Sequence, residues 1–299
     1  MPAPRAVVFA YHNVGVRLFL TLLAHGVEIA FLVTHQDDPK ENVWFDSVAR
    51  CAEERGIRVI KPQKVNTRSV IEEVAAAQPD FIFSFYYRQM LSDEILALAQ
   101  RGAYNMHGSL LPKYRGRSPV NWAVLHGEQE TGASLHEMVS KPDAGRLVAQ
   151  ERAPILPDDT ALEVFDKVTV AAEICLDKAL PGLLDGTAPH VAMDLHKGSY
   201  FGGRTPEDGQ IDWSQPARHI HNLVRAVAPP YPGAFADIGE RRLQVNRSLC
   251  LDEATTQPPG TLCQQGQCIL AACGDARSLR IVDWSYAPLQ MQNHGKQSV

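Results

Sequence analysis

The sequence predicts an α/β protein: a doubly wound, mostly parallel sheet of Rossmann-like type, followed by a small β-barrel-like domain. In the first half, short and nearly continuous apolar runs alternate with helical segments, which is typical of parallel strands buried on both faces. After about residue 205 the pattern changes to short strands separated by Gly, Asp and Pro turns. We therefore expect one domain over residues 1–204 and a β-rich domain over residues 205–299.

The elements of the first domain follow from hydrophobic periodicity. Strands are expected in short, mostly apolar runs, at Ala6–Ala10, Val27–Val33, Ile57–Ile60 and Asp80–Phe85. Helices are expected where apolar residues recur every three or four positions, at Gly15–His25, Phe45–Arg55, Val70–Ala77, Asp93–Gln100 and from Thr160 to about Leu180. Ser92 is expected to cap the fourth of these helices, and Pro181 with Gly182 to end the last.

The second domain begins with a helix and continues as strands. The helix is expected at Pro216–Val227, and the strands at Phe235–Ile238, Arg241–Cys250, Gly260–Leu262, Gln267–Ala272 and Leu279–Trp284. The last residues, Gln290–Val299, are polar and are expected to fray.

Composition excludes several classes of protein. The longest apolar stretch, Leu18–Val33, is interrupted by polar residues and is shorter than the ~20 residues of a membrane span, so we expect a cytoplasmic protein without membrane insertion. A net charge of −5 argues against nucleic acid as a partner. Cys263, Cys268 and Cys273 are evenly spaced, but no CxxC pair or nearby histidine accompanies them, so we expect no metal site. The first turn, Tyr11–Gly15, lacks the GxGxxG pattern of a dinucleotide-binding dehydrogenase.

The most informative stretch is residues 104–117, which reads YNMHGSLLPKYRGR. If it begins as a strand, Asn105 and His107 lie two residues apart and project to the same face. Open α/β sheets bind ligands at the carboxyl ends of their strands, which makes the pair a candidate site. An N-x-H pair alone is weak support, because a histidine near a strand end is more often a structural hydrogen-bonding group.

The whole stretch closely resembles the signature of the 10-formyltetrahydrofolate-dependent formyltransferases, and a second family element follows as Lys141-Pro142-Asp143-Ala144-Gly145. The resemblance implies an N-formyltransferase with 10-formyltetrahydrofolate as co-substrate, no metal, and catalytic residues Asn105, His107 and Asp143 in the first domain. Chemistry supports these roles. An amide donor stabilises the oxyanion of the tetrahedral intermediate, a histidine carries the proton, and a neighbouring carboxylate raises the histidine pKa and fixes one tautomer.

The resemblance also implies a folate-binding set. Its members match family positions near the folate, and they are Gln89, Met90, Leu91, Arg117, Val139, Ser140, Lys141, Pro142 and Asp143. Histidines outside the signature receive no catalytic role; His136, which lies in an apolar strand, is interpreted as structural.

Relatives of this kind formylate methionyl-tRNA, glycinamide ribonucleotide or nucleotide-linked amino sugars. The loop Thr34–Asn42 carries three acids and one lysine, which disfavours tRNA, and glycinamide ribonucleotide relatives need no second domain. The whole chain resembles the branch that formylates the 4-amino group of UDP-4-amino-4-deoxy-L-arabinose in lipid A modification and polymyxin resistance. In this branch the second domain contributes to the sugar-nucleotide site, where Arg204 and Arg225 are candidate contacts.

Three alternatives stay open: a methionyl-tRNA formyltransferase, an enzyme for another nucleotide-linked amino sugar, and a non-catalytic folate or nucleotide sensor. The best-known enzyme of this branch is fused to an NAD-dependent decarboxylase, for which a chain ending at Val299 has no room. The sequence is compatible either with a separate formyltransferase or with one half of a bifunctional enzyme. The sequence is also compatible with an oligomer.

Overall fold

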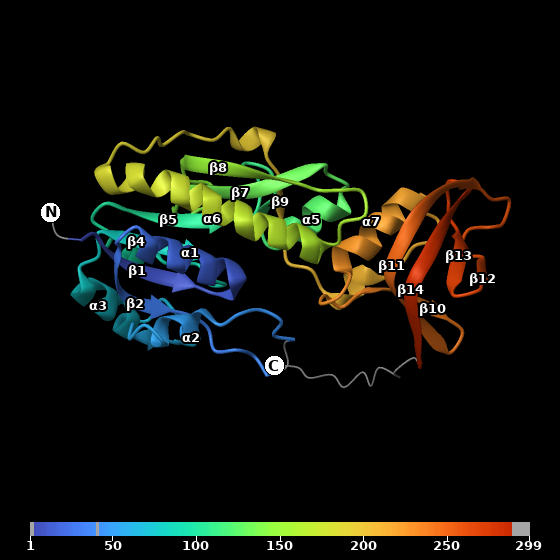
Figure 1. Cartoon of the computed structure of the whole chain (residues 1–299), viewed down its shortest axis with the longest axis horizontal. Helices are drawn as coiled ribbons and strands as arrows, with labels where there is room; N and C mark the ends of the chain where they lie inside the picture. The colour runs from blue at the N-terminus through green and yellow to red at the C-terminus, as the bar shows by residue number, and fades with distance from the viewer. Residues whose placement is uncertain (1–2, 40–41, 289–299) are drawn as a thin grey trace. The chain divides into compact units, whose positions relative to one another are not determined.

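Two structural units make up the chain, as seen in a computed structural model that describes residues 3–39 and 42–288 (Figure 1). The first unit ends at Gly203 and the second begins at Arg204. Two short segments from the first half of the sequence, Val124–Gly127 and Pro157–Leu162, also belong to the second unit.

The first unit is built on a seven-stranded sheet with the order β3-β2-β1-β4-β5-β7-β8. Five strands run parallel: β1 (Arg5–Ala10), β2 (Glu28–Val33), β3 (Val59–Ile60), β4 (Phe81–Phe85) and β5 (Gly102–His107). The strand β7 (Glu130–Glu137) runs antiparallel to both of its neighbours, β5 and β8 (Leu147–Pro154), so β8 has the same direction as the first five strands. The predicted mostly parallel sheet is confirmed. Because β1, β4 and β5 are adjacent and parallel, their carboxyl ends meet at one edge.

Helices cover both faces of this sheet (Figure 1). On one face lie α1 (His12–Ala24) and α6 (Ala161–Asp185), which are joined by the ion pair Arg17–Glu173 and by a hydrogen bond between His25 and Asp177. The six-residue α2 (Val48–Glu53) packs beside α1. On the other face, α3 (Arg68–Ala77) and α4 (Asp93–Leu96) share a buried cluster with Val7 and Phe9 of β1. The predicted cap of α4 is confirmed, since the Ser92 hydroxyl accepts a hydrogen bond from the Ile95 amide.

The predicted end of α6 was wrong. The helix continues through Pro181 and Gly182 to Asp185. Pro181 lies at an exposed position close to the C-terminus of the helix, where its missing N–H costs only one hydrogen bond. The turn that follows holds Gly186 at a φ of 82°, and the amides of Thr187 and Ala188 donate to the Gly182 carbonyl.

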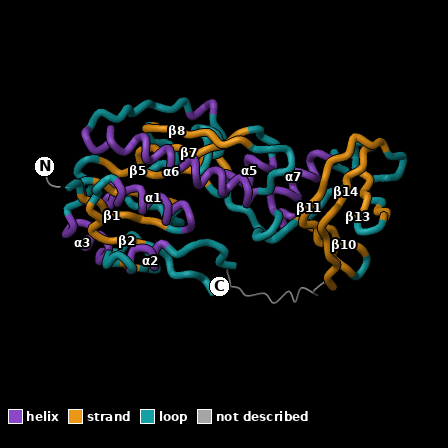
Figure 2. The backbone as a smooth tube through the Cα atoms, viewed as in Figure 1, coloured by secondary structure: helices purple, strands orange, loops and turns teal. Residues whose placement is uncertain are grey.

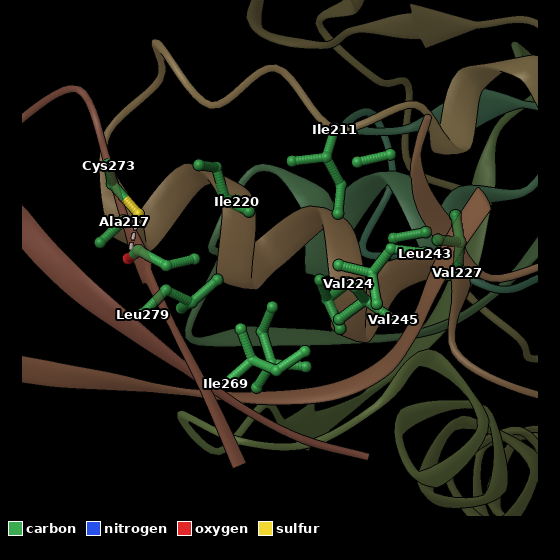
Figure 3. Close-up of a cluster of buried hydrophobic side chains, with 14 residues drawn as sticks. Ile211, Ala217, Ile220, Val224, Val227, Leu243, Val245, Ile269, Cys273 and Leu279 are labelled. Carbon is green, nitrogen blue, oxygen red and sulfur yellow. Dashed lines mark hydrogen bonds between the residues drawn. The ribbon is translucent and has the colours of Figure 1, made fainter. Parts of the chain in front are cut away.

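The second unit contains a five-stranded antiparallel sheet with the order β10-β11-β14-β13-β12. Its strands are β10 (Ala234–Ile238), β11 (Arg241–Ala254), β12 (Leu262–Gln265), β13 (Cys268–Ala272) and β14 (Arg277–Pro288). The helix α7 (Ala217–Val227) packs on this sheet, and Figure 3 shows Ile220 and Val224 of α7 in one buried cluster with Leu243, Ile269 and Leu279.

The remaining elements are short. Between α6 and α7 the chain is mostly loop (Figure 2), with the 3-10 turns η1 (Leu195–Lys197) and η2 (Pro206–Gly209) and the two-residue strand β9 (Tyr200–Phe201). The strand β6 (Arg115–Gly116) pairs with β9, and α5 (Pro119–Leu125) follows β6. Within the described ranges, no helix is both long enough and apolar enough to cross a membrane. The expected fraying of Gln290–Val299 falls outside the described residues.

Candidate active site

Asn105 and His107 lie together at the carboxyl end of β5, as the two-residue spacing predicts. His107 is buried, with 6% of its surface exposed, and Asn105 is half-buried. Along its edge, β5 pairs with the antiparallel strand β7, where Asn105 lies opposite His136 and His107 opposite Ser134. Rigid strands on both sides therefore fix the backbone of both candidate residues.

Asp143 reaches the same place from the turn between β7 and β8. Its Oδ1 lies 3.6 Å from Nδ1 of His107, and its Oδ2 accepts a hydrogen bond of 2.9 Å from the amide of Gly116. Asp143 has a φ of 50°, a backbone conformation that is uncommon outside glycine and that persists only where surrounding contacts hold it. The structure thus brings together the three residues predicted to be catalytic.

The contacts of His107 define its tautomer. Its Nε2 lies 2.7 Å from the carbonyl oxygen of Tyr114, which can only accept, so Nε2 carries a proton. In the neutral ring, Nδ1 is therefore unprotonated and lies on the side of Asp143. A proton accepted at Nδ1 would be stabilised by that carboxylate.

Burial and charge act in opposite directions on this pair. Burial lowers the pKa of His107 below its ordinary value of 6.5, and this effect exceeds the opposing effects of Asp143 and the Tyr114 carbonyl. Asp143 thus raises the pKa of His107, as predicted, but burial lowers this pKa by more. For Asp143, burial raises the pKa, but His107, His136 and the Gly116 amide together hold it well below its ordinary range. At neutral pH the pair is an imidazole beside a carboxylate.

His136 is a site residue that sequence reasoning missed. It is 2% exposed, its Nε2 lies 3.1 Å from Nδ2 of Asn105, and the same Nε2 lies 3.5 Å from Oδ1 of Asp143. Its Nδ1 donates to the Glu137 carbonyl over 2.8 Å, so Nε2 accepts one N–H of Asn105. That contact orients the Asn105 amide and leaves its second N–H for a ligand. The available signal was a pair of polar residues, Ser134 and His136, on either side of Leu135.

The predicted folate-binding residues lie in two loops of the first unit and after β6. In the loop after β4, Gln89 bonds the Val65 amide and the Gln63 carbonyl, Met90 is 53% exposed and Leu91 is buried. In the loop between β7 and β8, Val139 is 41% exposed. Ser140 and Lys141 are also exposed, and Pro142 is half-buried. Arg117 is exposed.

Arg204 and Arg225 belong to the second unit, so the structure does not place them relative to Asn105, His107 and Asp143. Arg225 is 6% exposed, and its guanidinium donates to Asn222 Oδ1, to the Asp159 carbonyl and to the Val124 carbonyl at 2.9, 3.1 and 3.2 Å. Arg204 donates from Nη2 to the Asp208 carbonyl at 3.1 Å. These contacts give Arg225 a structural role within its own unit.

Cys263, Cys268 and Cys273 differ in environment: exposed, half-buried and buried, respectively. Over residues 3–39 and 42–288, no group of three or more His, Cys, Asp or Glu side chains is arranged to hold a metal ion.

Fold and site together define a class: a two-unit α/β enzyme with a buried His–Asp pair and an amide donor at the carboxyl edge of a mostly parallel sheet. The chain belongs to the formyl transferase family, because the family profile described as formyl transferase matches residues 18–180 and the one described as formyl transferase, C-terminal domain, matches residues 204–296.

Solved structures share this fold. An N-formyltransferase from Helicobacter canadensis, in complex with folinic acid and dTDP-3-aminofucose, is 19% identical with a TM-score of 0.72, over 93% of this chain and 98% of the other. WlaRD, a sugar 3N-formyl transferase solved with dTDP and 5-N-formyl-THF, is 18% identical with a TM-score of 0.74, over 94% and 98%. A variant of HypX from Aquifex aeolicus is 17% identical with a TM-score of 0.65, over 96% of this chain and 46% of that protein.

Proposed function

We propose that this enzyme transfers the formyl group of 10-formyltetrahydrofolate to the amino group of a nucleotide-linked sugar, and that the sugar nucleotide is UDP-4-amino-4-deoxy-L-arabinose. The observation that carries the proposal is the grouping of Asn105, His107 and Asp143 at one sheet edge, with Nδ1 of His107 3.6 Å from Asp143. The reaction needs a base that is neutral at physiological pH, a partner for the resulting cation and a donor for an oxyanion.

Each residue supplies one of these functions. The amine attacks the formyl carbon, and a C–N bond forms. The carbonyl oxygen becomes an oxyanion, which accepts a hydrogen bond from the second N–H of Asn105. Nδ1 of His107 takes the proton that the amine loses, and Asp143 stabilises the imidazolium. Collapse of the intermediate breaks the bond between the formyl carbon and the folate nitrogen, which receives the proton from His107. The enzyme is thereby restored, and the products are the formamide and tetrahydrofolate.

The proposal that 10-formyltetrahydrofolate is the formyl donor rests on the loops around this site. The exposed side chains of Met90 and Val139 are apolar groups of the kind that cover the faces of a flat ring system, and Arg117 offers a cation for a carboxylate. Two relatives of the same fold were solved with folinic acid or 5-N-formyl-THF. We propose the folate contacts at Gln89, Met90, Leu91, Arg117 and residues 139–143 on this basis.

The proposal for the formyl acceptor rests on the charge of one loop and on two proteins of the same fold. In the loop after β2, Asp37 accepts a hydrogen bond of 2.6 Å from the Tyr11 hydroxyl, and Asp38 is exposed. These carboxylates would repel a tRNA backbone. Lys40 and Glu41, the other charged residues of that loop, lie outside the described residues. One relative was solved with dTDP-3-aminofucose and the other, a sugar 3N-formyl transferase, with dTDP, which supports a nucleotide-linked amine; the UDP-arabinose assignment rests on the sequence resemblance.

A panel of acceptors tests the proposal. The protein is incubated with 10-formyltetrahydrofolate and, separately, with UDP-4-amino-4-deoxy-L-arabinose, a dTDP-linked 3-amino sugar and methionyl-tRNA, and formylated product is measured by mass spectrometry. We expect the UDP sugar to show the highest kcat/KM. A higher value for the dTDP sugar would overturn the choice of sugar but not the class, and formylation of methionyl-tRNA at a comparable rate would overturn the class of acceptor.

A further inference from the structure

The segment Gly198–Gly202 lies against the loop that follows the signature motif. The parallel pair β6–β9 aligns Arg115 with Tyr200 and Gly116 with Phe201. The amide of Arg115 donates to the Ser199 carbonyl and the amide of Arg117 to the Phe201 carbonyl, each over 3.0 Å. The Tyr114 amide also donates to Ser199 Oγ, a residue 85 positions later in the sequence. The short ladder therefore joins two segments that are distant in the chain.

Phe201 also contacts the loop through its ring. The ring stacks on Tyr114, with centroids 5.4 Å apart and an interplanar angle of 17°, and on Trp122, at 4.8 Å and 24°. Trp122 returns a hydrogen bond of 3.1 Å from its indole N–H to the Gly202 carbonyl. Offset stacking of this kind adds to the area that the rings bury.

Gly116 shows how closely the two segments approach. Its φ is 97°, a conformation that favours glycine, and a Cβ at this position would collide with the carbonyl oxygen of Phe201. The neighbouring positions Tyr114 and Ser118 also have positive φ, at 56° and 53°. A loop with this backbone keeps its shape only where surrounding contacts over-determine it, and the segment with Phe201 supplies several of them.

The loop in turn supplies one backbone partner to each member of the His–Asp pair. The Tyr114 carbonyl accepts from Nε2 of His107 at 2.7 Å, and the Gly116 amide donates to Oδ2 of Asp143 at 2.9 Å. We propose that Phe201 is a positioning residue for the reaction: by stacking on Tyr114 and pairing with Gly116, it holds the two backbone groups that orient His107 and Asp143. This inference rests on the proposed roles of that pair.

Replacement of the Phe201 ring tests the proposal. Phe201→Leu keeps an apolar side chain but removes the stacking, and Phe201→Tyr keeps the ring. Phe81→Leu is the matched control, because Phe81 is buried and stacked on Phe83 but lies at the start of β4, at the opposite edge of the sheet. For each variant, kcat and the KM for the amino sugar are measured at several pH values, together with thermal unfolding.

We expect Phe201→Leu to lower kcat ~10- to 100-fold, because small displacements of reacting groups have effects of this size. The acceptor KM should stay within twofold, the pH midpoint of kcat should move, and Phe201→Tyr should restore most of the activity. A wild-type kcat and pH profile in Phe201→Leu would overturn the proposal. So would an equal loss of kcat in Phe81→Leu, since general destabilisation would then explain both.

A second measurement needs no substrate. Hydrogen exchange of the Gly116 amide should be at least ~10-fold faster in Phe201→Leu than in the wild type or Phe81→Leu; unchanged exchange would overturn the proposal. If the wild type formylates no acceptor while this difference in exchange is present, the proposed function fails and the positioning of the loop by Phe201 stands.

Discussion

Nδ1 of His107 lies 3.6 Å from Oδ1 of Asp143, and Nε2 on the other side of the ring lies 2.7 Å from the Tyr114 carbonyl. The carbonyl fixes which nitrogen carries the permanent proton, so the nitrogen that exchanges a proton is the one beside the carboxylate. Because Asp143 also accepts the Gly116 amide, its orientation does not depend on the protonation of His107. Under the proposed mechanism, the pair takes up a proton transiently and releases it.

Removal of the Asp143 charge should therefore impair turnover and shift its pH dependence. We expect Asp143→Asn to lower kcat by roughly 10²–10⁴-fold. Since Asp143 raises the pKa of His107, its loss should also move the acid limb of kcat to lower pH. Asp177→Asn, which removes an exposed carboxylate paired with His25, serves as control and should be near wild type. An acid limb that moves to higher pH in Asp143→Asn contradicts the arrangement.

The pH profile of the wild type is a separate prediction. His107 acts as a base only when neutral, and burial lowers its pKa below 6.5, so kcat should stay high down to a midpoint below 6.5. The same group makes the folded state less stable as pH falls through this range, because the unfolded chain binds the proton more readily. Steady-state kcat between pH 5 and 9 provides the measurement. A midpoint above 7 would show that the charge of Asp143 outweighs burial.

Asn105 should act mainly in the transition state. We expect Asn105→Ala to lower kcat ~10²–10³-fold with little change in KM, as for other losses of an oxyanion donor. His136→Ala should show a smaller loss of the same kind, because Asn105 keeps its amide but loses the acceptor that orients it, 3.1 Å away. Steady-state kinetics separates the possibilities: a raised KM at constant kcat would assign Asn105 to ground-state binding instead.

Substitution of Arg225 distinguishes a structural role of this residue from a role in substrate binding. Its buried guanidinium donates to Asn222 and to the carbonyls of Val124 and Asp159. A lysine has a single nitrogen and reaches fewer of these acceptors, so Arg225→Lys should lower the free energy of unfolding by ~1–3 kcal/mol. Thermal or urea unfolding measures the loss. Unchanged stability with a raised KM for the sugar nucleotide would instead indicate that Arg225 binds substrate.

Local sequence patterns were sufficient to predict much of the fold. Short, mostly apolar runs identified the four strands from β1 to β4, and the Ser92 cap of α4 followed from its side-chain chemistry. The end of α6 did not follow from such a rule, because Pro181 near an exposed C-terminus costs too little to stop the helix.

The site was harder to predict because it depends on contacts distant in sequence. The spacing of Asn105 and His107 placed both on one face of a strand, but the pairing of β5 with β7 that sets His136 opposite Asn105 is a tertiary feature. Burial of His107, and with it the direction of its pKa shift, likewise depends on how the loops close over β5. The β6–β9 pairing left no sequence signal beyond Gly116.

The central claim is that His107 carries the proton in formyl transfer. Its most direct test is the single-turnover rate of formyl transfer from 10-formyltetrahydrofolate to UDP-4-amino-4-deoxy-L-arabinose, measured for the wild type and for His107→Ala at saturating substrates. We expect the wild type to form the N-formyl product and the variant to react ~10²–10⁴-fold more slowly, the range for loss of a general acid–base group. A rate for His107→Ala within tenfold of wild type would contradict the account.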